Sequence, residues 1–394
     1  MARTKKSDDQ KPLKRHVHLY FSPWQHESRA WRAGSSALAA KLTNEVVYVG
    51  YRVDGLPNRE VVDDGQTILR IGAKPSRVGS PRILRALSLP LWWWSVVRTQ
   101  NSSNVSLVTA HSLAALPAAV ILARRCGAAL LYDAHELETE REGWSLGIRR
   151  LAKIFEKALI RKCDHTIVVN DSILSWYKST YPRLSVSTVR NVPVIPTNIG
   201  ESRLRETLGI SEDTVLYVYC GLFGKGRGLN EVIQAFSKLP DDFHIAFVGF
   251  GLLEPDVVAA ASRYPNIHFH PAVSQAELIT LLRGADVGVF LPDGASASYQ
   301  NSLPNKVFEY SAAGLGLLVS DAKELKRFAS EYPLAKSVPT SVDAIRQAVE
   351  SWPKESIREG KATMTFSPPS WQQEVVKLLE AYEVVEKNHQ FGNR

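Results

Sequence analysis

The chain has 394 residues, of which 44% are apolar and 22% are charged, and it carries a formal net charge of +8. This length predicts two domains rather than one core, and no apolar run reaches the roughly eighteen residues that a membrane-spanning helix needs. The positive charge favours anionic partners such as phosphate groups or an anionic membrane, and because no nucleic-acid-binding motif is recognisable, nucleic acid is not expected as a partner.

The first half of the chain alternates between buried-type strands and helical patterns. It begins with a basic, polar segment, residues 1–16, which we expect to be a disordered tail. Apolar runs then predict strands at 17–21, 45–51, 106–111, 129–134 and 165–170. Helical periodicity between them predicts helices at 29–43, 112–126 and 146–162. This alternation is typical of a parallel sheet covered by helices, and it predicts a first Rossmann-like domain over residues 17–198.

The same alternation restarts after a Pro-, Asn- and Gly-rich linker at 191–202. Strands are predicted at 214–221, 244–251, 267–273, 286–292 and 316–321, with helices at 229–238, 254–264, 275–283 and 306–313. A second Rossmann-like domain is therefore expected over residues 199–367. The segment 368–394 contains an amphipathic pattern at 370–387, which we expect to return to the first domain. The predicted fold class is α/β, with two doubly wound domains facing an interdomain cleft.

Two segments of the second half have candidate binding residues at strand ends, where open parallel sheets bind ligands. GLFGKGRGLNEV, residues 221–232, combines glycines with Lys225 and Arg227 before a helix, which suits a phosphate but also an ordinary flexible turn. NSLPNKVFEYSAAGLGLLVSD, residues 301–321, places Lys306 and Glu309 one helical turn apart. The two side chains could form a surface ion pair, or they could bind a ligand whose ribose hydroxyls meet the carboxylate and whose pyrophosphate meets the lysine.

The first half has a second set of candidates at its strand ends. YDAHELETE, residues 132–140, places His135 and Glu136 directly after a predicted strand. His111 ends another strand, and His26 and Arg29 lie where the first strand leads into a helix. An arginine there could bind a phosphate or a carboxylate, whereas a single histidine is more often structural. No second histidine gives the zinc-protease spacing, and no metal site is predicted.

The D-x-H-E-L segment, the Gly/Arg-rich turn and SLPNKVFEYSAAG together resemble the family-4 type of nucleotide-sugar glycosyltransferases with the two-domain GT-B fold. The resemblance covers roughly residues 17 to 385. It implies that Glu309 binds the ribose of the donor, that Arg227 meets its diphosphate, and that His135 reaches the transferred sugar. It also implies a group of further donor-binding residues: Gly221, Lys225, Gly249, Gly251, Asn301, Ser302, Leu303 and Lys306. The remaining candidates, His26, Arg29, His111 and Glu136, are expected on the acceptor side or near the donor phosphate.

Three positions depart from the family pattern. Asn301 stands where many relatives have a glutamate that contacts the donor sugar, Leu222 replaces an arginine of the phosphate loop, and Gly316 replaces a proline. These departures keep open a non-catalytic partner subunit that binds a nucleotide sugar or a lipid. A sugar-nucleotide 2-epimerase is a further alternative, although the PNKVFEY motif counts against it.

The resemblance implies a retaining, metal-independent enzyme with a nucleotide-diphosphate sugar as co-substrate and no cofactor. The expected acceptor is a glycan or a polyprenyl-linked molecule of polysaccharide biosynthesis. The three cysteines, Cys126, Cys163 and Cys220, are widely spaced and are expected to be buried free thiols in a reducing cytoplasm.

Residues 71–98 combine basic residues with three consecutive tryptophans. This stretch suits either a peripheral contact with the inner face of the cytoplasmic membrane or a helix packed into the core.

Overall fold

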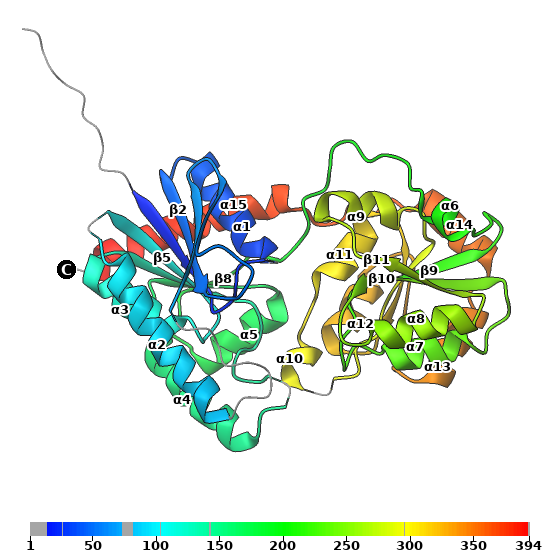
Figure 1. Ribbon diagram of the computed structural model, residues 1–394, viewed down its shortest axis with the longest axis horizontal. Helices are drawn as coiled ribbons and strands as arrows, with labels where there is room; N and C mark the ends of the chain where they lie inside the picture. The colour runs from blue at the N-terminus through cyan, green and yellow to red at the C-terminus, as the bar shows by residue number, and fades with distance from the viewer. Residues whose placement is uncertain are drawn as a thin grey trace, which may run out of the picture. The chain divides into compact units, whose positions relative to one another are not determined.

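The computed structural model describes residues 14–25, 27–72, 82–102, 104–141, 143–294 and 296–392. The chain forms two compact units. Unit 1 contains the chain up to residue 139 together with residues 144–190 and 375–394, and unit 2 contains residues 140–143 and 191–374. Each unit is a parallel sheet with helices packed on it (Figure 1), so the predicted α/β fold with two Rossmann-like domains is confirmed.

Unit 1 is built on an eight-stranded sheet in the order β3-β4-β2-β1-β5-β6-β7-β8. All its neighbours pair in parallel except β3, which is antiparallel to β4. Its strands are β1 (Arg15–Leu19), β2 (Glu45–Tyr51), β3 (Arg59–Asp63), β4 (Gln66–Ile71), β5 (Val105–His111), β6 (Ala129–Ala134), β7 (His165–Val168) and β8 (Val186–Thr188). Its helices are α1 (Ser28–Ala39), α2 (Arg82–Gln100), α3 (Leu116–Cys126), α4 (Leu146–Ile160), α5 (Asp171–Thr180) and α15 (Trp371–Gly392), whose first residues belong to unit 2.

Unit 2 is built on a six-stranded sheet in the order β11-β10-β9-β12-β13-β14, parallel throughout. Its strands are β9 (Val215–Leu222), β10 (Phe243–Phe250), β11 (Ile267–Pro271), β12 (Val287–Phe290), β13 (Gly316–Ser320) and β14 (Ala335–Val338). Its helices are α6 (Leu204–Leu208), α7 (Leu229–Phe236), α8 (Glu254–Arg263), α9 (Gln275–Leu282), α10 (Ala297–Gln300), α11 (Asn305–Ala312), α12 (Lys323–Glu331), α13 (Val342–Glu350) and α14 (Lys354–Thr363).

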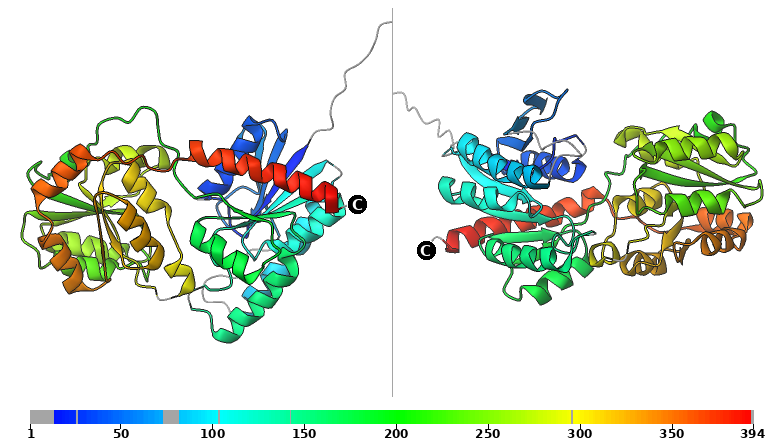
Figure 2. Two further views of the ribbon diagram at one scale, coloured as in Figure 1. Left: turned by 180° about the vertical axis from the view of Figure 1, so that it is seen from behind. Right: turned by 60° about the horizontal axis from the view of Figure 1, so that its bottom comes forward.

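The helix α15 extends the amphipathic pattern predicted at 370–387 and contacts unit 1 (Figure 2). The ring of Tyr382 meets the ring of His16 edge-on at 5.5 Å, and Asn388 donates a hydrogen bond to the carbonyl oxygen of Asp164. Burial of Leu378 and Val385 in this helix places its apolar side against the unit.

Several boundaries differ from the predicted ones. The first strand begins at Arg15, so part of the predicted tail 1–16 is ordered, while residues 1–13 lie outside the described residues. The division between the units falls at residue 190 rather than 198. The hairpin β3–β4 was not predicted, although its Asp64-Gly65 turn is a hairpin signal. All three cysteines are free, but Cys126 and Cys163 are only half-buried.

The tryptophans of α2 divide between packing and exposure. Trp92 is fully buried and donates a hydrogen bond to the carbonyl oxygen of Gly50, and Trp93 donates to that of Ala114. Trp94 is 60% exposed. Residues 73–81 of the predicted basic stretch lie outside the described part of the chain. Within the described residues, no helix combines the length and apolar character needed to cross a bilayer.

Candidate functional site

The end of β9, where the glycine-rich turn begins, approaches α11 closely in unit 2. A Cβ atom built on Gly221 would lie 2.2 Å from Nζ of Lys306, and Gly221 has a φ of +126°. Only glycine leaves this space and adopts this backbone conformation readily. The structure therefore brings together two predicted donor-binding residues that are far apart in the sequence, with the Lys306 ammonium beside the Gly221 backbone.

Glu309 lies one turn further along α11 and is 6% exposed. Its Oε1 atom accepts a hydrogen bond of 3.1 Å from Nε2 of Gln275, at the start of α9. Burial raises the pKa of the nearby Cys220 thiol to about 12; the charge of Glu309 adds to this rise and that of Lys306 opposes it. Glu309 is therefore buried, and its hydrogen-bond partner Gln275 is a neutral amide. Because this partner carries no charge, the charge of the carboxylate is available to a ligand. Gln275 was not predicted, because nothing in the sequence relates α9 to α11.

Gly249 and Gly251 lie where β10 ends beside β9. Gly249 pairs with Gly221 in register, and a Cβ atom on Gly249 would lie 1.9 Å from the Gly221 carbonyl oxygen. Three large apolar side chains are exposed at the same edge: Leu222, Phe250 and Leu252. The structure therefore places bare backbone and an apolar surface next to Lys306, and these apolar residues were not predicted as part of the site.

The remaining predicted donor residues lie in the loops around this edge. Arg227 is half-buried and Lys225 is exposed. Asn301 ends α10 and donates a hydrogen bond of 2.8 Å from Nδ2 to the carbonyl oxygen of Ala297. The amide of Ser302 donates to the carbonyl oxygen of Tyr299, and Leu303 is buried. The Asn301 amide thus satisfies a backbone carbonyl group at the end of α10, which gives this side chain a structural role in the helix.

Asp133 is the centre of the second cluster, in unit 1, at the end of β6. Its carboxylate is 1% exposed and accepts hydrogen bonds from Nε and Nη2 of Arg29 at 2.8–3.1 Å. Arg29 also donates to the carbonyl oxygen of Val189. Burial by itself would raise the pKa of Asp133, but the charges of Arg29 and His135 and the hydrogen bonds of the histidines hold it well below its usual range. Asp133 is therefore ionised in the folded protein.

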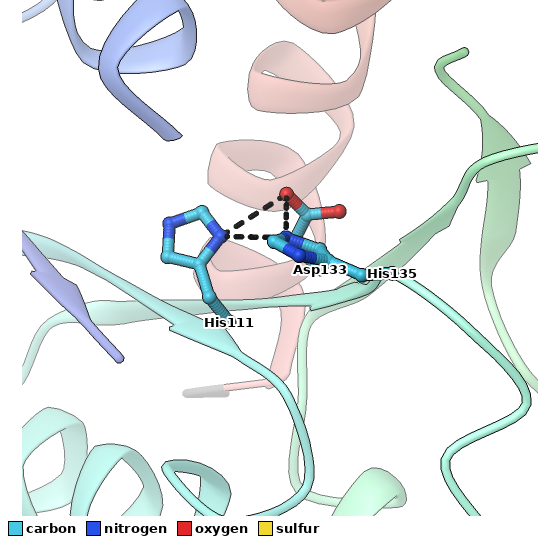
Figure 3. Close-up of side chains that lie close together, drawn as sticks. All are labelled: His111, Asp133 and His135. Carbon is cyan, nitrogen blue, oxygen red and sulfur yellow. Dashed lines mark hydrogen bonds and ion pairs between the residues drawn. The ribbon is translucent and has the colours of Figure 1, made fainter. Parts of the chain in front are cut away.

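Two histidines complete this cluster (Figure 3). Nδ1 of His111 and Nε2 of His135 each lie 3.2 Å from Oδ2 of Asp133, and the two nitrogens are 3.1 Å apart. His111 is fully buried, and burial lowers its pKa to about 4. The side chain of His135 is 21% exposed. The cluster thus fixes the ring of His135 while leaving part of it accessible.

The histidine network continues into the sheet along β1. Nδ1 of His18 is 2.8 Å from Nε2 of His111, and Nε2 of His16 is 2.8 Å from the Thr109 hydroxyl. Neither β1 histidine was predicted. The alternation in RHVHL could have indicated them, because residues two apart on a strand share one face.

The structure revises two of the four acceptor-side predictions. The Arg29 guanidinium is committed to Asp133 and Val189 and is 4% exposed, so it is a structural partner instead of a ligand contact. His111 is fully buried, so it contacts His135 rather than an acceptor. Glu136 is exposed, and His26 lies outside the described residues.

His111, Asp133 and His135 are also the one group in the described part of the chain with three ligand-type atoms close enough to hold a metal ion. These atoms already lie at hydrogen-bond distances from one another. Arg29 neutralises the only carboxylate of the group, so a divalent cation would meet uncompensated positive charge there. The arrangement suits a hydrogen-bonded network better than a metal centre.

The comparisons with known proteins agree with this fold. Residues 35–197 match the model of Glycosyltransferase Family 4. No curated protein matches the chain. Among solved structures, the chain is similar to sucrose-phosphate synthase from Thermosynechococcus elongatus, with a TM-score of 0.73 at 15% identity over 94% of this chain and 98% of that one.

Two other solved structures are also similar to the chain. Anabaena HepE in complex with UDP-glucose has a TM-score of 0.65 at 13% identity, over 96% of this chain and 98% of that one. WaaG, a glycosyltransferase involved in lipopolysaccharide biosynthesis, has a TM-score of 0.61 at 16% identity, over 96% and 99%. The predicted resemblance and the GT-B fold are confirmed, and the family match together with the fold supports a glycosyltransferase.

Proposed function

We propose that this protein transfers a sugar from a nucleotide-diphosphate sugar to a glycan or lipid-linked acceptor, with retention of configuration and without a metal. The observation that carries the proposal is the convergence of Lys306 and Glu309 with the bare backbone of Gly221 at one edge of unit 2. The similar HepE structures contain UDP, alone, with glucose, or as UDP-glucose, which supports the same class of donor here.

Each member of the unit 2 cluster has a distinct role in this proposal. The Glu309 carboxylate accepts hydrogen bonds from the two ribose hydroxyls, and the Gln275 amide holds it in position. Lys306 and Arg227 neutralise the diphosphate as it leaves. The exposed Leu222 and Phe250 offer an apolar surface for a flat base.

His135 positions the transferred sugar in this proposal. Asp133 accepts from its ring and is itself held by Arg29, so the ring keeps one orientation. Fixing a contact group in this way avoids an entropic cost during the reaction. We do not assign His135 a nucleophilic role.

The proposed acceptor belongs to polysaccharide biosynthesis, and we place the protein at the inner face of the cytoplasmic membrane as a peripheral enzyme. The net charge of +8 supports this location, because anionic lipids attract basic surfaces. A lipid-linked acceptor would then be held close to the enzyme.

Thermal unfolding with UDP, GDP, ADP and common sugar nucleotides tests the donor site. A nucleotide at 100 times its Kd should stabilise the protein by about 2.7 kcal/mol. We expect one nucleotide to stabilise the wild type, and Glu309→Ala to lose this effect and to raise the donor KM. Glu350→Ala, which changes an exposed glutamate of α13 in the same unit, should behave like the wild type.

The alternatives predict other results. If no nucleotide stabilises the wild type, the protein is a non-catalytic relative that supports another transferase. If a sugar nucleotide is converted without any acceptor into an altered sugar nucleotide, the protein is a 2-epimerase. Unchanged donor kinetics in Glu309→Ala would remove the assignment of this residue.

A further inference from the structure

The helix α4 (labelled in Figure 1) exposes several apolar side chains, and its two buried residues are the acid Glu156 and Ile160. Glu156 is its fully buried acid, and three tyrosine hydroxyls donate hydrogen bonds to this carboxyl group. The exposed apolar side chains are Leu146 (72%), Ile148 (50%), Leu151 (68%), Ile154 (68%) and Phe155 (41%). A surface helix normally has the opposite arrangement, so this side of α4 is built to contact something outside the fold.

The exposed charges on α4 itself have one sign. Four exposed basic residues lie on or directly after α4: Arg150, Lys157, Arg161 and Lys162. Glu156 is the only acid within the helix, and it is buried on the opposite side. On a helical wheel Arg150, Lys157 and Arg161 form one edge of the exposed stripe that contains Ile154 and Leu151.

A cavity of about 800 Å³ opens at the carboxyl end of the same helix. Its lining combines basic Lys157, Arg161 and Arg183 with apolar Leu184 and Phe391, and it includes one acid, Asp164. The apolar and basic surface therefore continues from α4 into a concave region.

We propose that the exposed side of α4 docks on an anionic lipid bilayer, with Leu151 and Ile154 entering the interface and the basic residues meeting lipid phosphates. Amphipathic helices with basic residues beside an apolar stripe bind membranes in this way. A second copy of the chain fits less well, because a two-fold contact would bring the same basic residues together.

This surface differs from the one expected in the sequence, the Trp-rich stretch at 71–98, in which Trp92 is buried in unit 1 and Trp94 is exposed. The inference deepens the proposed membrane association and rests on that part of the proposed function alone. Vesicle binding needs no turnover, so its failure would leave the nucleotide proposal standing.

Flotation of the full chain with vesicles tests the inference. We expect binding to phosphatidylcholine vesicles that contain phosphatidylglycerol, weaker binding at high salt, and little binding to phosphatidylcholine alone. Leu151→Ser with Ile154→Ser should lower the partition coefficient at least about tenfold. Arg150→Glu with Lys157→Glu should lower it at least about 25-fold, since each basic residue near the surface contributes about fivefold.

Matched controls separate this surface from general effects. Val61→Ser with Val376→Ser removes two apolar side chains that are 70% and 55% exposed elsewhere in unit 1, and Lys238→Glu changes an exposed charge of unit 2. We expect these variants to bind vesicles like the wild type. Each variant should keep the cooperative thermal unfolding of the wild type, which verifies that it is folded.

Three results would overturn the inference: wild-type protein that does not bind the anionic vesicles at low salt, α4 variants that bind as well as the controls, or a wild-type dimer that the α4 substitutions convert into monomers in light scattering. The last result would assign the surface to a second copy of the chain.

Discussion

Asp133 and Arg29 form a buried ion pair in unit 1, with side chains that are 1% and 4% exposed. A buried pair of this kind contributes little net stability, but breaking it leaves one charge unpaired and desolvated. Here the same carboxylate also contacts His111 and His135. A single residue therefore connects the stability of unit 1 with the orientation of the proposed sugar-contacting histidine.

Asp133→Asn should lower the free energy of unfolding by about 3–5 kcal/mol, because the Arg29 guanidinium stays buried without a counter-charge. Glu45→Gln is the matched control. Oε2 of Glu45 lies 2.7 Å from Nε of Arg15, and both side chains are partly exposed. Exposed ion pairs of this kind contribute at most about 1 kcal/mol to stability. Urea unfolding compares the two. If both variants lose an equally small free energy of unfolding, the burial of Arg29 does not require the charge of Asp133.

Gly249 shows how closely two strands meet at the proposed donor site. A Cβ atom there would lie 1.9 Å from the Gly221 carbonyl oxygen, and backbone cannot move away as a flexible side chain can. The contact between Gly221 and Lys306 is of another kind, because the atom of Lys306 that lies near Gly221 is Nζ, at the end of a flexible side chain. The contact between Gly249 and Gly221 keeps the strand ends in register. The Lys306 side chain, by contrast, is free to rearrange around a ligand.

Among the elements, α15 shows how a distant segment completes unit 1. Leu378, Tyr382 and Val385 are each at most 3% exposed, and Tyr382 contacts His16 of the first strand. The end of the chain therefore stabilises the sheet face that holds the histidine network.

Leu378→Ala in α15 should lower the free energy of unfolding by about 2–5 kcal/mol, because the cavity that it leaves adds to the lost burial. Val376→Ala, two residues away and 55% exposed, should change it by at most about 0.5 kcal/mol. Denaturant unfolding followed by the tyrosine and tryptophan signal measures both. A small loss for Leu378→Ala would mean that α15 detaches without unfolding unit 1.

Across the whole molecule, buried histidines dominate the response to acid. Burial lowers the pKa of His16 to about 3 and that of His111, His165 and His268 to about 4, from an ordinary 6.5. Below pH 6.5 the unfolded chain binds protons that the folded chain does not, so stability falls with pH down to about 4. Glu156 acts in the opposite sense, because burial raises its pKa from 4.5 to about 7.

We expect the free energy of unfolding to fall between pH 6.5 and about 4, because the described histidines with a lowered pKa outnumber Glu156, whose pKa is raised. His165→Gln should reduce the slope, since the His165 ring contacts only the hydroxyls of Ser185 and Ser187 in the hydrogen bonds that the structure records. Urea unfolding across this pH range measures the slope. A constant free energy would show that these histidines also titrate in the folded protein.

The sequence by itself determined the α/β architecture, and it supplied the motifs of the proposed donor site. Strand and helix periods are local, and glycines, Lys306 and Glu309 at strand ends indicate a site because parallel strands end at one edge. The α4 segment was also predicted as a helix. The sequence pattern was sufficient to predict a feature wherever that feature depends on residues close together in the chain.

Only the tertiary structure decided which groups meet across the chain. Gln275 reaches Glu309 from another helix, Arg29 binds Asp133 instead of a ligand, and Glu156 is buried because tyrosines of β6 and α5 surround it. That last contact turns the apolar side of α4 outward. The direction in which an amphipathic helix faces is set by its partners, which lie elsewhere in the sequence, and not by its own period.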